Sequence, residues 1–188
     1  MIRDLTADLL REVAVNVSTE PRLQPLSGER IGSSANMSDS ARLDIKATGF
    51  WNDAKDAFFD VRVVHPFASS YNGQRLTSIY RQHEQKKRAE YGRRVREIEY
   101  GSFTPLVFTT TGGMAGEATV FYRRLAALLS SKRDEPYSTV MGWLRCSLSF
   151  SLLRAAITCV RGTKKRRDKE IYSDCLSEVV ASSRPTIH

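Results

Sequence analysis

Two aspartates lie inside apolar runs that have strand character. Asp44 belongs to ARLDI, and Asp60 belongs to DAFFDVRVVHP at 56–66. Strands disfavour aspartate, and a buried charge costs free energy unless another group compensates for it. If both carboxylates project toward one point from neighbouring strands, they repel each other unless a cation lies between them. Carboxylate oxygens favour Mg²⁺ or Mn²⁺, so the pair predicts a metal site suited to phosphoryl displacement.

The residues around Asp60 alternate as a strand requires. Asp60 and Arg62 share one face, while Phe59 and Val61 share the other, because successive side chains point to opposite faces. Asp60 and Arg62 are therefore expected to face a common polar site. The alternative is that the two aspartates are solvated ends of edge strands, or that they form ion pairs with Arg42 and Arg62.

The order of predicted elements indicates a single α/β domain. Strands are expected at 41–48, 57–65 and 103–111, and helices at 2–17, 74–99, 115–132 and from Pro136 to about Arg161. Gly101 is expected to stop the long helix at 74–99, and Gly112-Gly113 to end the last strand. Strands followed by crossover helices favour a sheet with helices packed on it.

The charge balance favours a polyanionic partner. The 188 residues include 29 Lys and Arg against 21 Asp and Glu, a formal net charge of +8. This favours nucleic acid over a membrane surface. No transmembrane span or signal peptide is predicted. Cys146, Cys159 and Cys175 have no metal-binding spacing and are expected to be free thiols in a reducing, intracellular compartment.

The arrangement of the acids resembles the PD-(D/E)XK nuclease core. That core has an aspartate in one strand, an acid-x-basic triplet in the next, then a helix and a further strand. Here Arg62 occupies the position of the usual strand lysine. A guanidinium does not transfer protons at neutral pH, and its fork suits phosphate better.

A resemblance to a more specific group of nucleases indicates where the missing lysine lies. The chain is similar to the restriction-like endonuclease domain at the C-terminal end of site-specific non-LTR retrotransposon proteins. The matching stretches cover most of 3–162: RDLTADLLREV, EPRLQPLSGE, ARLDIKATGFW, AFFDVRVVHP, EQKKRAEYGRRVREIE and SFTPLVFTTTGGM. In that group the lysine lies on the helix after the strand, a few residues before a tyrosine. The matching position is Lys87, with Lys86 as second choice, and Tyr91 follows one turn later on the same face.

The resemblance implies a metal-dependent DNA endonuclease that nicks a chromosomal strand to prime reverse transcription. It implies Mg²⁺ or Mn²⁺ at Asp44 and Asp60, catalysis by these aspartates with Lys87 or Lys86, and a nuclear location. The fold would be a small mixed sheet flanked by helices, with a C-terminal helical extension, over 1–162. A basic, flexible tail would follow at 163–188. The element's reverse transcriptase domain and RNA would be partners. The alternative is a non-catalytic nucleic-acid-binding remnant of such a nuclease.

Four further residues could belong to the site. Glu20 and Glu84 are candidates for the extra acid that many such nucleases carry, although each is also typical of a solvated surface. His65 and His83 could suggest zinc beside Asp60, but their spacing matches no metal motif, and surface or capping roles are favoured.

Several cations are expected to contact DNA. Arg62, Lys86 and Arg94 are expected to rim the cleft and bind backbone phosphates. The strand-end loop at 110–113 is expected to turn tightly at its glycines and to lie near the DNA. A second basic run, KKRRDK, lies in the tail.

Overall fold

The computed structural model describes residues 1–24 and 42–158. The chain divides into two compact units, Met1–Leu152 and Leu153–His188, and the sheet belongs to the first. The predicted boundary near residue 162, the basic tail at 163–188 and two of the three cysteines lie outside the described residues. Cys146 is described and is an exposed free thiol.

The first unit is mixed α/β, built on a small four-stranded sheet. Its strands are β1 (Val15–Thr19), β2 (Ile45–Thr48), β3 (Asp56–Val64) and β4 (Ser102–Thr109), in the order β1-β2-β3-β4. The first two pairings are antiparallel, whereas β3 and β4 are parallel. A parallel pair requires a long crossover, and the helical segment between β3 and β4 supplies it. The predicted class, a small mixed sheet flanked by helices, is confirmed.

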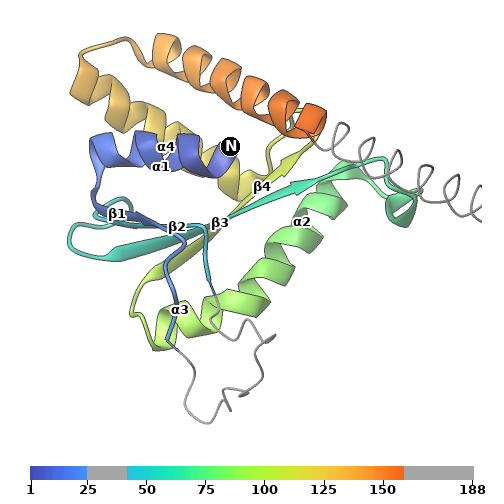
Figure 1. The fold of residues 1–188 in the computed structure, drawn as a ribbon, viewed down its shortest axis with the longest axis horizontal. Helices are drawn as coiled ribbons and strands as arrows, with labels where there is room; N and C mark the ends of the chain where they lie inside the picture. Colours follow the sequence, from blue (N-terminus) through green and yellow to red (C-terminus); the bar gives the residue numbers. More distant parts are fainter. Residues whose placement is uncertain (25–41, 159–188) are drawn as a thin grey trace, which may run out of the picture. The chain divides into compact units, whose positions relative to one another are not determined.

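Helices cover both faces of this sheet (Figure 1). One side carries α1 (Ile2–Val13), α4 (Gly116–Arg133) and the part of the last helix that belongs to the first unit. The other side carries the crossover, which consists of α2 (Leu76–Lys87), the π-helical turn η2 (Arg88–Gly92) and α3 (Arg93–Glu97). Each face therefore has its own apolar contacts to make.

Strand alternation divides the core between the two faces. Phe59 belongs to the larger cluster with α1 and α4, and its neighbour Phe58 belongs to a smaller cluster with Val95 of α3. Asp60 is two residues from Phe58, so it faces the crossover helices. The same alternation that builds the two cores thus directs the Asp60 carboxylate toward α2.

The N-terminal helix is shorter than predicted. The predicted helix at 2–17 is wrong after Val13, because Ala14 is extended and β1 begins at Val15. Asn16 has a φ of 51°, and the ladder with β2 has an irregular register between Val15 and Ser18. Asparagine tolerates the left-handed region better than most residues, which lets the chain turn into the sheet.

The strand that was expected to contain Asp44 is also shorter. β2 is Ile45–Thr48, so the prediction of a strand over 41–48 is wrong at its start. Asp44 directly precedes β2, and the backbone of Arg42 pairs with Arg22 in an isolated β-bridge outside the strand. Backbone and side-chain hydrogen bonds of Asp44 with its neighbours take the place of a regular ladder there.

The crossover is not one uniform α-helix. The predicted helix at 74–99 begins at Leu76, contains the π-helical turn and ends at Glu97. A π turn holds more residues than an α turn, so it rotates the faces that follow, and Val95 is fully buried beyond it. Gly101 does not stop the helix. A Cβ there would lie 2.8 Å from the Asp56 carbonyl oxygen and from the Phe58 ring, so glycine permits a close approach.

The other predicted elements agree with the structure to within a few residues. They are β3, β4, α4 and the helix at Tyr137–Thr158. That last helix is long and apolar enough to cross a membrane by length and composition, a test that the core helix of a soluble protein also passes. Its buried side chains, among them Val140, Leu144 and Leu148, belong to the larger core cluster.

Candidate functional site

Asp60 forms a buried ion pair with Lys87. Asp60 lies on β3, between β2 and β4, and is only 6% exposed. Lys87, the last residue of α2, places its Nζ 3.1 Å from Asp60 Oδ2 and donates a hydrogen bond to Oδ1 at 3.3 Å. Lys87 Nζ also lies 3.7 Å from Glu90 Oε2 and 5.0 Å from the centroid of the Tyr91 ring. The predicted shared face of Lys87 and Tyr91 is therefore present.

Hydrogen bonds fix Asp44 beside β3. The β2–β3 ladder ends where Ile45 pairs with Phe59, and Asp44 directly precedes it. The Asp44 N–H donates to Phe59 O at 3.1 Å, and its carbonyl accepts from the Glu20 N–H at 2.9 Å. Its carboxylate Oδ2 accepts from the Val61 N–H at 2.6 Å. Three hydrogen bonds thus position this aspartate.

The two aspartates are coupled electrostatically. Burial raises the pKa of the Asp60 carboxyl, Lys87 opposes the rise through its charge and hydrogen bond, and the charges of Asp44 and Glu90 add to it. Burial also raises the pKa of the Tyr91 phenol, with further contributions from Glu90, Asp60 and Asp44. The charge of Asp44 thus adds to the electrostatics of both Asp60 and Tyr91.

A cationic cavity of about 310 Å³ adjoins the pair. Arg62, His83, Lys86, Lys87 and Glu90 line it. Arg62 and Lys86 are exposed there. Burial lowers the pKa of His83, and the charges of Arg62 and Lys86 lower it further. The predicted grouping of Arg62 and Lys86 beside Asp60 and Lys87 is thus found, and it can hold a polyanion.

The other predicted residues lie elsewhere. Glu20 is exposed and pairs with Arg3 at 2.6 Å and Arg42 at 2.9 Å. Glu84 accepts the Glu117 N–H at 2.9 Å, which satisfies a backbone donor at the start of α4. Arg94 lies half-buried on α3 and is not among the residues that line the cationic cavity.

The histidines and the strand-end loop support the architecture. His65 Nδ1 lies 2.9 Å from Thr110 Oγ1, and His83 Nε2 lies 2.8 Å from Tyr71 Oη. In the loop after β4, Gly112 has a φ of 93°. A Cβ on Gly113 would lie 2.1 Å from Tyr80 Oη. The predicted tight glycine turn is confirmed, and it is held against α2.

The alternative of solvated edge-strand aspartates, or of ion pairs with Arg42 and Arg62, does not describe Asp60. Asp60 is buried on an inner strand and pairs with Lys87, whereas the alternative expected solvated edge positions or pairing with Arg62. Arg42, the partner suggested for Asp44, pairs with Glu20. A carboxylate that is both buried and raised in pKa is typical of functional sites.

The donors fit a hard divalent cation in one respect. Asp60 Oδ2 is buried and accepts no well-aligned hydrogen bond from the part of the chain that the structure describes, although Lys87 Nζ lies 3.1 Å away. Residues 1–24 and 42–158 contain no group of three or more His, Cys, Asp and Glu side chains placed to hold a metal ion. Mg²⁺ is usually held by only one or two carboxylates together with water and substrate phosphates, so a pair of aspartates is chemically compatible with this ion.

The sequence reasoning missed two features of this site. Glu90 was not singled out, although its i,i+3 spacing from Lys87 could have suggested the contact. The π-helical turn directly after Lys87 carries no sequence signal that we recognise, and such turns are frequent at functional sites. Both features determine how the Lys87 ammonium is held.

No protein-family model matches the chain, and no curated protein matches it either. The chemistry of Asp44, Asp60 and Lys87, with the cations around them, is therefore what indicates a function.

Proposed function

We propose that this chain is a metal-dependent DNA endonuclease domain with a PD-(D/E)XK-type site. The observation that carries the proposal is the buried Asp60–Lys87 pair next to a cationic cavity, with Asp44 hydrogen-bonded to the same strand. Burying an ionised carboxylate costs stability, and its retention here is explained if the group works in catalysis. The resemblance to the restriction-like endonuclease domain of site-specific non-LTR retrotransposon proteins supports the same activity.

The proposed roles follow from the positions of the side chains. Asp44 and Asp60 would hold Mg²⁺ or Mn²⁺, which when bound activates water and stabilises charge on the phosphate oxygens. The Lys87 ammonium would stabilise the negative charge that develops on the scissile phosphate. Arg62 and Lys86 would bind the flanking phosphates, and their exposure leaves both accessible to a DNA strand.

The biological setting belongs to the same proposal. A strand nick that primes reverse transcription, in the nucleus, would place this domain beside a reverse transcriptase and the RNA of its element. DNA is then the substrate, and the formal net charge of +8 suits it.

A binding module without catalysis is the second candidate. Lys87 Nζ already neutralises Asp60 and also approaches Glu90, so the carboxylates are partly satisfied without a metal ion. A remnant of a nuclease could keep this arrangement together with its cationic cavity. Such a protein would bind DNA with a steep dependence on salt and leave it intact.

Plasmid nicking separates the two candidates. The purified chain is incubated with supercoiled plasmid and Mg²⁺ or Mn²⁺, beside Asp60→Asn and the matched control Asp56→Asn. Asp56 lies on the same strand and also pairs with a lysine, Lys46, at 2.7 Å. We expect Asp60→Asn to lower the nicking rate at least about 100-fold, because a preorganised charged group is lost. Asp56→Asn should change it less than about threefold, since Asp56 lies outside the proposed site.

Two outcomes would overturn the nuclease proposal. If the wild-type chain binds DNA with the expected salt dependence yet nicks it with neither metal, the binding module is correct. If Asp60→Asn nicks as fast as wild type, the active site lies elsewhere.

A further inference from the structure

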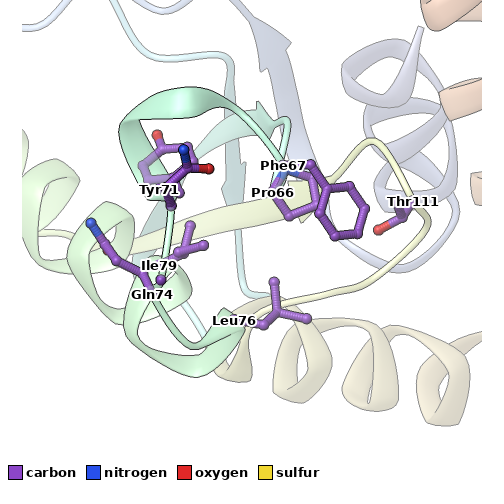
Figure 2. Close-up of a pocket in the computed structure, with 9 residues that line it drawn as sticks. Pro66, Phe67, Tyr71, Gln74, Leu76, Ile79 and Thr111 are labelled. Atoms are coloured by element: carbon purple, nitrogen blue, oxygen red, sulfur yellow. The ribbon is translucent and has the colours of Figure 1, made fainter.

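A second cavity lies beyond the end of β3, on the same side of the sheet as α2. It has a volume of about 390 Å³. Phe67, Tyr71, Leu76 and Ile79 supply apolar walls, and Gln74 and Thr111 supply polar groups. Figure 2 shows these side chains around one space, with Phe67 and Pro66 on the side of Thr111, and Tyr71, Gln74 and Ile79 on the other.

Some side chains that line this cavity are buried, and others are exposed to solvent. Ile79 is 1% exposed, and Tyr71 is tied to His83 by the 2.8 Å hydrogen bond. Phe67 is 77% exposed and Leu76 is 43% exposed. Phe67 and Leu76 therefore expose apolar surface together at the rim of one cavity, which is where another molecule can make contact.

Charge restricts the class of that molecule. The stretch from Val64 to His83 contains Arg75 and Arg81 and no Asp or Glu. His83 lines the cationic cavity and is hydrogen-bonded to Tyr71, which lines this second cavity. The two cavities are therefore neighbours. A ligand that is flat and apolar on its faces, polar at its edge and attached to an anionic backbone matches all of these features. An unpaired nucleobase of a DNA strand is such a ligand.

We propose that this cavity takes one unpaired base of the DNA bound at the candidate nuclease site, stacked on Phe67. The inference rests on the proposed function, and it adds a preference for distorted or unpaired DNA. Phe67 follows β3, so a strand that passes Asp60 and Arg62 continues toward it. The Gln74 amide and the Thr111 hydroxyl are available to the edge of the base, and the 390 Å³ is ample for one base.

The experiment compares two duplexes that differ only by one base. One carries a single-nucleotide bulge, and the other carries an abasic residue in the same bulge, so the phosphate charge is identical. Affinities of the full chain are measured by fluorescence anisotropy in EDTA, which prevents nicking. Wild type should prefer the base-containing bulge about tenfold, as expected for one stacked base. Phe67→Ala should lose the preference, and Phe67→Tyr should keep it.

A matched control is available on another part of the first unit. Phe150 is 66% exposed on the last helix, so Phe150→Ala removes a ring of similar exposure and should leave the preference unchanged. Equal affinity of wild type for the two duplexes would overturn the inference. So would a preference that survives Phe67→Ala.

Its failure is distinguishable from failure of the proposed nuclease. A chain that nicks plasmid but ignores the unpaired base disproves only the base pocket. A chain that shows the Phe67-dependent preference but never nicks disproves only the catalytic role. RNA with the same bulge serves as a further arm, and tighter Phe67-dependent binding to RNA would overturn the assignment to DNA.

Discussion

Two aspartates of β3 each pair with a lysine from another element, and their environments differ. Asp56, at the start of β3, pairs with Lys46 at 2.7 Å and accepts a hydrogen bond from Thr48 Oγ1 at 2.6 Å. Asp60 pairs with Lys87 at 3.1 Å, and its Oδ2 lacks a hydrogen bond among the described residues. Asp56 thus has a lysine and a threonine as partners, whereas Asp60 has Lys87 alone as its side-chain partner among the described residues.

The opposite pKa shifts follow from this difference. Burial acts to raise the pKa of Asp56, but the hydrogen bonds from Lys46 and Thr48 outweigh it, and the pKa is lowered. Burial raises the pKa of Asp60, and Lys87 does not offset it. An ion pair by itself is thus no sign of function. A carboxylate whose pKa is raised by burial, beside a second acid and a cationic cavity, is more typical of a functional site.

The largest expected effect is on catalysis, and it concerns the two lysines. Lys87→Ala should lower plasmid nicking about 100-fold, because a preorganised cation at the scissile phosphate is lost. Lys46→Ala removes the same charge from the other pair and should leave the rate within about threefold. Initial rates with saturating Mg²⁺ measure both. Circular dichroism must confirm that each variant is folded, and equal losses in the two variants would remove the distinction between the pairs.

Stability should respond in opposite directions. Asp60→Asn should raise the free energy of unfolding at pH 7 by about 1 kcal/mol, because it removes a buried charge. Lys87 is not left unpaired in this variant, since Glu90 remains 3.7 Å away. Asp56→Asn should lower the unfolding free energy by about 0.5 kcal/mol, because Asp56 loses favourable pairing that is partly screened by solvent. Urea unfolding at pH 7 tests both values. A destabilised Asp60→Asn would show that the Lys87 pair is structural.

The pH dependence sharpens this contrast. Asp60 has a raised folded-state pKa, so its ionisation lowers stability as the pH rises from the unfolded pKa through the folded pKa. Asp56 has a lowered pKa, and its stabilising effect is lost as the pH falls from the unfolded value through the folded one. The advantage of Asp60→Asn should therefore disappear on acidification at a higher pH than the defect of Asp56→Asn. Unfolding free energies across this acidic range measure both trends, and coincident trends would contradict the assigned shifts.

Strong local patterns made much of this arrangement predictable. The run AFFDVRVV alternates over its whole length, so the face of Asp60 followed once the strand was recognised. Lys87 and Tyr91 share a face because of helical spacing, and the cation–ring contact bears this out.

Tertiary packing decided what the sequence did not reveal. VNVST is short and directly continues a helical pattern, so β1 became recognisable only by its pairing with β2. The π-helical turn precedes α3, whose Val95 belongs to the same core cluster as Phe58, a residue distant in sequence. The cavity beside Phe67 likewise joins three segments: the loop after β3, the first turn of α2, and Thr111. Loops meet in ways that local periodicity does not encode.

The smallest expected effect concerns DNA affinity without metal, and the two aspartates again provide the comparison. Asp60→Asn and Asp56→Asn change the net charge equally, so any difference between them reports local position. Asp60 adjoins the cationic cavity, and its removal should tighten duplex binding about twofold at low salt, because one negative charge near the phosphates is gone. The salt dependence should keep its slope, since the cations that contact phosphate are unchanged. Asp56→Asn, at the far end of β3, should bind as wild type does.

Titrations in EDTA at several salt concentrations measure these quantities. Loss of binding in a folded Asp60→Asn variant would mean that this carboxylate organises the DNA-binding surface rather than serving only catalysis.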